Sequence, residues 1–235
     1  MNARDELRVR GLYAGYGAAD VVKDINLTVR SAEIVLLTGA NGAGKSTTMN
    51  AIAGRIGARK GTVSVNDAVL PRRLDRRARL GVVLLPEQRS IFNSLTTAEN
   101  LQVAGRLVDA GLDLFPELRE HLRRRAGLLS GGQQRILGLA RSLAARPKFL
   151  LLDEMTLGLA PIIVSRLLDC LSEITANHDI GILLVEQHVH RALSIVHRGY
   201  VLSDGQVSLE GDAKQLRAHS AQIENAYLGD TLTAG

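Results

Sequence analysis

Residues 39–47, Gly-Ala-Asn-Gly-Ala-Gly-Lys-Ser-Thr, have the types and spacing that bind phosphate groups. They fit the pattern G-x-x-x-x-G-K-[ST], with Gly39, Gly44, Lys45 and Ser46 at the defining positions. Glycines let successive backbone N–H groups turn toward phosphate oxygens. Lys45 adds a positive charge at the β- and γ-phosphates, and the Ser46 hydroxyl can ligate Mg²⁺. The segment therefore predicts a site for a nucleoside triphosphate with Mg²⁺.

The residues on either side of this loop have the context that the motif requires. Residues 34–37 form a short apolar run suited to a buried strand, and apolar residues recur at helical spacing at Met49, Ile52, Ala53 and Ile56. The order strand, loop, helix points the N-terminus of the helix at the phosphates, where the helix dipole favours negative charge.

A second motif ends the apolar run 149–152 with two adjacent carboxylates, Asp153 and Glu154. In a parallel sheet, ligands bind beyond the carboxyl ends of the strands, so we expect both acids beside the phosphate loop. Asp153 can hold Mg²⁺ through its water shell, and Glu154 can orient and deprotonate a water that attacks the γ-phosphate. The pair predicts hydrolysis of the bound nucleotide.

The third motif is Ser130-Gly131-Gly132-Gln133, which follows Leu129 and precedes a helical pattern from Gln134 to Ala144. Ser130 alone would be an ordinary helix N-cap. A cap needs only one serine, however, and the glycines permit a close backbone approach to a helix N-terminus, which is itself an anion site. Because one ATP needs only one phosphate loop, this motif predicts a second role.

Alternation of apolar and polar residues marks the antiparallel parts of the chain. It covers residues 25–29, where Ile, Leu and Val alternate with polar side chains, and residues 62–65. Near the C-terminus, residues 200–202 and 207–209 flank an Asp204-Gly205 turn, which indicates a hairpin.

Other runs are continuously apolar, which is typical of parallel strands covered on both faces. These runs are 82–85, 149–152 and 182–185, and long helical patterns separate them. The segment from Phe92 to Leu129 is rich in Leu and Arg and has a helical character. We therefore predict a single α/β domain over residues 1–235, with a mainly parallel sheet and an antiparallel N-terminal β part. Its core would be residues 1–86 and 130–235, with a helical insertion at 87–129.

Composition excludes several classes of protein. Of 235 residues, 46% are apolar and 23% charged, which is ordinary for a globular protein, and the single cysteine, Cys170, rules out an internal disulfide. The net charge is +5, but the arginine clusters at 72–79 and 119–125 lack interleaved aromatic residues. We therefore expect no nucleic-acid partner and interpret the clusters as solvated faces or as surfaces that meet phosphates or partner loops.

Along the chain the three motifs follow in the order phosphate loop, residues 129–133 and the acid pair at 153–154. In this order they resemble the motifs of the ATP-binding subunits of ABC transporters, and the resemblance covers essentially the whole chain. It implies that two such subunits pair head to tail. Residues 130–133 of one subunit would then complete the ATP site that Lys45 and Glu154 of the other form. ATP would hold the dimer closed, and hydrolysis would release it.

The resemblance also implies the contacts of the nucleotide. Tyr16 matches the aromatic residue whose ring stacks on adenine, with Tyr13 as an alternative. The phosphate loop would contribute Gly39, Ala40, Asn41, Gly42, Ala43, Gly44, Lys45, Ser46 and Thr47. The contacts from the other subunit would be Ser130, Gly131, Gly132 and Gln133. The Mg²⁺ contacts would be Ser46, Asp153 and either Glu87 or Gln88.

Three positions depart from the common pattern of the family. Most members have Gln where Glu87 stands and His where Gln187 stands, whereas Gln88 and His188 lie directly beside these positions. A shift of one residue in the alignment could restore either common side chain to the γ-phosphate, so both pairs stay open, and Gln187 and His188 both join Glu154 as catalytic candidates. Met155 replaces the proline that usually follows the catalytic glutamate, and we expect it to change the stiffness of the loop without loss of chemistry.

A finer resemblance is to the smaller ATPase subunit of branched-chain amino-acid importers. It is carried by the stretches LLPEQR at 84–89, LGLAP at 157–161, LLVEQ at 183–187 with RGYVL at 198–202, and AYLG at 226–229. It implies a motor subunit that hydrolyses ATP to import branched-chain or related amino acids. The alternatives are another cargo, such as urea, short amides or an exported product, and a soluble ABC ATPase outside transport.

The implied partners are a second ATP-binding subunit, identical or different, transmembrane permease subunits and a substrate-binding protein. No apolar run approaches the roughly 18 residues that span a bilayer, and the first six residues lack the apolar stretch of a secretory signal. We therefore expect a cytoplasmic protein that is peripheral on the inner face of the cell membrane through permease subunits.

Overall fold

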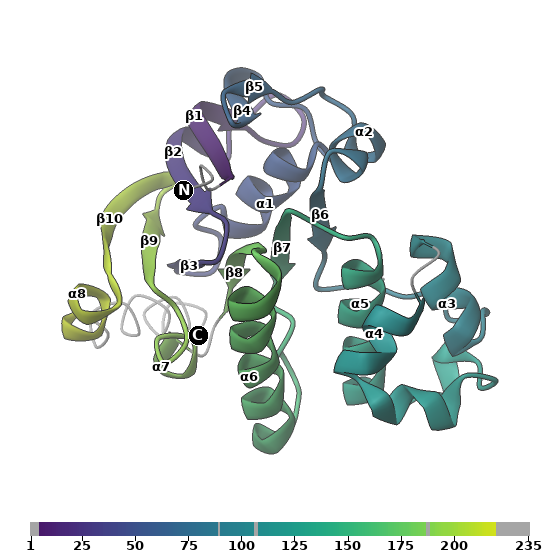
Figure 1. Cartoon of the computed structure of the whole chain (residues 1–235). Helices are drawn as coiled ribbons and strands as arrows, with labels where there is room; N and C mark the ends of the chain where they lie inside the picture. Colours follow the sequence, from purple (N-terminus) through teal and green to yellow (C-terminus); the bar gives the residue numbers. More distant parts are fainter. Residues whose placement is uncertain (1–4, 89, 106–107, 187–188, 220–235) are drawn as a thin grey trace, which may run out of the picture.

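The computed structural model describes residues 5–88, 90–105, 108–186 and 189–219, which form two β-sheets flanked by helices (Figure 1). Sheet A is antiparallel and has the strand order β2-β1-β4-β5. Its strands are β1 (Glu6–Ala14), β2 (Val22–Arg30), β4 (Lys60–Val65) and β5 (Ala68–Val69). The predicted alternation in β2 is confirmed, because its apolar positions are buried whereas Asn26 and Arg30 are exposed.

Sheet B has the strand order β10-β9-β3-β8-β7-β6, and all its strands are parallel except β10, which pairs antiparallel with β9. They are β3 (Ile34–Gly39), β6 (Val82–Leu85), β7 (Phe149–Asp153), β8 (Gly181–Val185), β9 (Arg198–Ser203) and β10 (Gln206–Asp212). The predicted parallel runs and the predicted hairpin are therefore confirmed. At the hairpin turn, Asp204 and Gly205 adopt left-handed backbone angles, with φ of 49° and 77°.

Helices α3, α4 and α5 gather on one side of the molecule, while β9, β10 and α8 lie on the other (Figure 1). The helices are α1 (Lys45–Ala53), α2 (Leu74–Arg79), α3 (Thr97–Ala104), α4 (Val108–Leu114), α5 (Gly131–Ala144), α6 (Pro161–His178), α7 (Val189–Ala192) and α8 (Ala213–Ala218), with 3₁₀ turns η1 (Pro116–His121) and η2 (Ala126–Leu128). Helix α5, which lies outside the predicted insertion, packs against α3 and α4 within it and also against β6 of the core. The predicted boundary of the helical insertion, residues 87–129, therefore stays a prediction. None of the helices in the described part of the chain combines the length and apolar character that crossing a membrane requires.

Side chains of sheet B alternate between two apolar cores, which explains why its strands are apolar without interruption. Leu36 and Leu152 pack into one core with α5 and α6. Their neighbours Leu37 and Leu151 pack into the other core, with sheet A and α1. Each fully buried leucine contributes about 1.5–3 kcal/mol. The strands that end at the predicted site are therefore held from both faces.

The first helix is shorter than its apolar spacing predicts. It ends at Ala53, so the prediction that Ile56 continues the helix is wrong. Gly54 adopts a left-handed φ of 76°, and its N–H group bonds the carbonyl of Ala51, which closes the last turn. A glycine in this position ends a helix because it adopts this conformation without steric strain.

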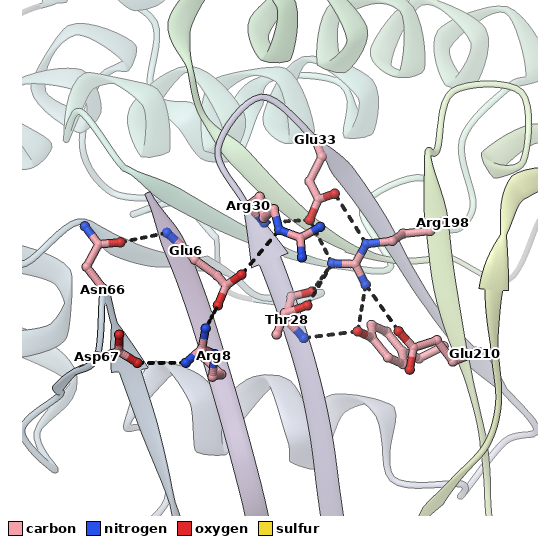
Figure 2. A network of polar contacts seen from close by, with 10 residues as sticks. Glu6, Arg8, Thr28, Arg30, Glu33, Asn66, Asp67, Arg198 and Glu210 are labelled. Atoms are coloured by element: carbon pink, nitrogen blue, oxygen red, sulfur yellow. Dashed lines mark hydrogen bonds and ion pairs between the residues drawn. The ribbon is translucent and has the colours of Figure 1, made fainter. Parts of the chain in front are cut away.

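Arg198 on β9 joins the two sheets, as Figure 2 shows. Its guanidinium donates two hydrogen bonds to the Glu33 carboxylate, at 2.8 and 3.3 Å. It also donates to the backbone carbonyl of Thr28 on β2 and to the Tyr200 hydroxyl, each at 2.6 Å. Because Glu33 directly precedes β3, this largely buried cluster fixes the start of the strand that leads to the phosphate loop.

Candidate functional site

The phosphate loop connects β3 to α1, and two of its glycines are sterically required. Gly39 has a φ of 142°, and a Cβ there would lie 2.2 Å from the backbone oxygen of Leu202. Gly44 has a φ of 100°, and a Cβ there would lie 2.4 Å from the side chain of Val22. Any other residue would collide with the backbone of β9 at position 39 and with the Val22 side chain of β2 at position 44.

Lys45, the first residue of α1, folds back over the loop. Its ammonium donates hydrogen bonds to the backbone carbonyls of Gly39 and Ala40, at 2.7 and 2.9 Å. Burial lowers the pKa of Lys45, since only 5% of the residue is exposed, while the nearby carboxylates Glu154 and Asp153 oppose this shift. The loop therefore presents a fixed cation at its mouth.

Asp153, the last residue of β7, lies beside the start of α1. The Ser46 hydroxyl donates to its carboxylate at 3.2 Å. Burial raises the pKa of Asp153 to about 6, the nearby Glu154 and Glu87 raise it further, and the hydrogen bond from Ser46 and the charge of Lys45 oppose the shift. The predicted neighbourhood of the two motifs is thus present in the structure.

The donors at this edge fit Mg²⁺. A hydroxyl and a carboxylate within 3.2 Å of each other supply hard oxygen ligands, which this ion prefers. Among the described residues, no group of three or more His, Cys, Asp or Glu side chains is placed to hold a metal ion. One hydroxyl and one carboxylate are the kind of protein contribution that Mg²⁺ accepts, because this ion usually takes its other ligands from water and from substrate phosphates.

Glu154 follows β7 with an unusual backbone. Its φ is 47°, in the left-handed region that non-glycine residues rarely adopt. The Glu154 N–H group donates to the Val185 carbonyl at the end of β8, at 3.0 Å. Its side chain is largely buried and lines the cavity of the phosphate loop. The loop after β7 therefore holds this carboxylate facing the phosphate site.

The cavity at the phosphate loop has a volume of about 350 Å³. It is lined by Tyr16, Val21, Asn41, Gly42, Gly44, Lys45, Ser46, Thr47 and Glu154. Tyr16 is 57% exposed, so its ring is available to a ligand, whereas Tyr13 lies on β1 with the Lys60 ammonium 5.2 Å from its ring centre. Of the two tyrosines considered for adenine, Tyr16 is therefore the one at the cavity.

A second cavity, of about 410 Å³, lies beside the segment that follows β6. Glu87, Gln88, Gly131 and Leu157 are among its lining residues. Glu87 is near enough to influence the charge of Asp153, and its backbone carbonyl accepts a hydrogen bond from Arg135 on α5, whereas Gln88 is exposed. The other open pair, residues 187 and 188, lies outside the described residues.

The segment Ser130-Gly131-Gly132-Gln133 begins α5, three residues earlier than the helical pattern predicts. The reason is a capping box: the Gln133 N–H donates to the Ser130 hydroxyl at 3.3 Å, and the Ser130 N–H donates to the Gln133 side chain at 3.0 Å. Ser130 and Gly131 are exposed. None of these four residues lines the cavity of the phosphate loop in the same chain.

Sequence reasoning missed one buried carboxylate, Glu186, which follows β8 and is 2% exposed. It accepts hydrogen bonds from the backbone N–H and the hydroxyl of Thr156, two residues after Glu154. Burial raises the pKa of Glu186 to about 7, although the bonds from Thr156 and the charge of Arg135 oppose the shift. A charged residue directly after the apolar run 182–185 was the available signal.

The largest of these cavities lies elsewhere, near the ends of α4, α5 and α6. Its volume is about 580 Å³, and its lining includes Leu114, Leu143, Pro147 and Ile180. It holds no residue predicted to act in the site. Size alone therefore does not identify the functional cavity.

Residues 22–157, more than half of the chain, match the sequence model of ABC transporters, and this part carries the phosphate loop and both acids. The chain belongs to the ABC transporter family. It is 36% identical over 226 residues to the high-affinity branched-chain amino acid transport ATP-binding protein BraG of Pseudomonas aeruginosa, covering 91% of this chain and 95% of BraG. It is 35% identical over 244 residues to LptB, the lipopolysaccharide export system ATP-binding protein of Escherichia coli, covering 95% and 97%.

A solved structure of an ABC transporter component has the same fold. The ADP conformation of MJ1267, an ATP-binding cassette, matches with a TM-score of 0.84 at 23% identity, covering 97% of this chain and all of the other. The predicted α/β fold and the predicted family are thus confirmed. The chain is the ATP-binding subunit of an ABC transporter.

The raised pKa of Glu186 predicts a pH-dependent stability. Because folding raises this pKa from its ordinary 4.5 to about 7, the folded state binds the proton more tightly, and the free energy of unfolding should fall as pH rises through this window and level off above it. Between pH 5 and 8, the fall in the free energy of unfolding should be about 2 to 3 kcal/mol smaller in Glu186→Gln than in the unaltered protein.

Urea denaturation between pH 5 and 8 measures the slope. The raised pKa of Asp153 also lowers the free energy of unfolding as pH rises to about 6. The effect of Glu186 is therefore the difference in slope between Glu186→Gln and the unaltered protein. Glu120→Gln, at an exposed position, is the matched control and should keep the slope of the unaltered protein. Equal slopes in all three proteins would contradict the prediction.

Proposed function

We propose that this subunit hydrolyses ATP to drive an importer for branched-chain or related amino acids. The observation that carries the hydrolytic part is the convergence of Lys45, Ser46, Asp153 and Glu154 at the carboxyl edge of sheet B. A buried cation, oxygen ligands and a fixed carboxylate are the parts that phosphoryl transfer to water uses.

Each residue then has a distinct role. The backbone of the phosphate loop and the Lys45 ammonium bind the phosphates, and the Tyr16 ring stacks on the adenine. Ser46 and Asp153 hold Mg²⁺, which when bound neutralises charge on the phosphate oxygens. The Glu154 carboxylate accepts a proton from the attacking water. Of Glu87 and Gln88, we assign the contact near the metal to Glu87, because it lies close enough for its charge to raise the pKa of Asp153.

The segment at residues 130–133 serves the site of a second subunit. Its helix N-terminus is exposed, and it does not line the cavity of its own phosphate loop. Two subunits, identical or different, would therefore pair head to tail, with each closing the other's site. Gln187 completes the contacts to the γ-phosphate, and His188 is the alternative.

The cargo is proposed from the relatives. BraG serves the transport of branched-chain amino acids, and we extend this cargo to the present subunit, with permease subunits and a substrate-binding protein as partners. With these partners, the subunit would act at the inner face of the cell membrane. A second candidate is an export system, because LptB is 35% identical. Uptake of radiolabelled leucine by cells that lack the gene separates the two: a loss indicates import.

Glu154→Gln should retain ATP and lower kcat by about a hundredfold to ten-thousandfold, because it removes the base and spares the phosphate loop. Lys45→Ala should instead weaken ATP binding by about tenfold to a hundredfold, the effect of losing a charged hydrogen-bond donor. Phosphate release and binding of a fluorescent ATP analogue measure the two effects. Lys214→Ala, which removes an exposed lysine on α8, is the control. Hydrolysis by Glu154→Gln at the unaltered rate would overturn the assignment of the base.

ATP should convert the Glu154→Gln protein from monomer to dimer, because the nucleotide remains between the two subunits. Adding Ser130→Arg should prevent this, since a long charged side chain would occupy the space of the partner's γ-phosphate. Light scattering with and without ATP measures the mass. Ser194→Arg, at an exposed serine outside the site, should still dimerise. ATP-bound protein that stays monomeric at high concentration would argue against the paired sites.

A further inference from the structure

A buried clasp joins the loop after β7 to the end of β8. The Glu186 carboxylate accepts the backbone N–H of Thr156 at 3.2 Å and also accepts its hydroxyl hydrogen bond. Both residues are almost inaccessible, at 2% and 1% exposure. Burying a carboxylate costs several kcal/mol, which its partners offset only in part, so a buried glutamate is a weak source of stability at this point of the fold. Stability alone therefore does not explain Glu186.

The clasp lies beside the strained backbone of Glu154. Glu154 holds a left-handed φ of 47°, which costs a non-glycine residue on the order of 1–2 kcal/mol. Such a conformation persists only where the surroundings over-determine it. Here the backbone is tied on both sides: the Glu154 N–H bonds the Val185 carbonyl at 3.0 Å, and Thr156 bonds Glu186. Met155, between them, is buried.

We propose that Glu186 is a positioning residue, which acts through Thr156 to hold the Glu154 carboxylate in the geometry for hydrolysis. This inference rests on the proposed role of Glu154 as the base. Without the clasp, the loop is free to relax from its left-handed turn, and the carboxylate swings away from the attacking water. Displacements of about 1 Å can lower a rate by about a hundredfold.

Glu186 does not serve as a second base itself. It is buried, and it is not among the described residues that line the cavity of the phosphate loop. The charged groups that act on it are the Glu154 carboxylate and the Arg135 guanidinium from α5. Glu186 instead acts on Glu154 indirectly: its hydrogen bonds hold Thr156, and only Met155 separates Thr156 from Glu154 along the backbone.

The test measures kcat and KM for ATP in the full-length subunit carrying Glu186→Ala, Thr156→Val or both. Each single change should lower kcat by about tenfold or more and leave KM within about twofold, because the phosphate loop is intact. The double variant should be no slower than Glu186→Ala, since that change already removes both hydrogen bonds, whereas Thr156→Val removes only the hydroxyl bond. Thr156→Ser, which keeps the hydroxyl, should restore most of the kcat that Thr156→Val loses.

Thermal unfolding and binding of a fluorescent ATP analogue accompany each variant. Should Glu186→Ala fail to fold, the near-isosteric Thr156→Val and its rescue by serine decide the question. Normal kcat in folded Thr156→Val, or losses that multiply in the double variant, would overturn the clasp. An unaltered protein that binds ATP without hydrolysing it would instead overturn the proposed function.

Discussion

The site depends on one constraint, that strands β3, β7 and β8 end at the same edge of sheet B. Their register pairs Leu37 with Val185 and Val185 with Asp153, so β7 and β8 end in one row of the sheet and β3 ends two residues beyond it. The phosphate loop, the two acids and Glu186 begin within two residues of this row. Because these strands pack into apolar cores on both faces, a change of register would require both cores to repack.

Burial gives this edge its electrostatic character. Three ionisable residues at this edge are largely inaccessible: Lys45, Asp153 and Glu186. Burial favours the neutral form of each, so it lowers the pKa of Lys45 and raises the pKa of both acids. The loops that carry them are correspondingly constrained, with left-handed backbone at Gly44 and Glu154. Buried ionisable groups with shifted pKa values destabilise a fold and are typical of functional sites, which agrees with the role proposed for this edge.

Sequence patterns were sufficient for the parts of the fold that local chemistry determines. The continuous runs predict the parallel strands because side chains on both faces must be apolar, and the motif at 39–47 predicts its own strand and helix. The predicted end of α1 was wrong because the left-handed backbone of Gly54 ends the helix, and the spacing of apolar residues contains no information about that conformation. The start of α5 was late by three residues because a capping box admits glycines into the first turn.

The clasp between Glu186 and Thr156 could not be predicted in the same way. The two residues lie 30 positions apart, and only the pairing of β7 with β8 brings them together. The choice of Tyr16 over Tyr13 also needed the structure, because both rings precede the loop in sequence and only one lines the cavity.

Hydrogen exchange with and without a non-hydrolysable ATP analogue and Mg²⁺ tests most directly whether this edge binds the nucleotide. If it does, amide exchange should become slower in residues 40–48 and stay unchanged around Leu114 and Leu143, at the larger cavity. Protection at the larger cavity with none in the phosphate loop would contradict binding at this edge.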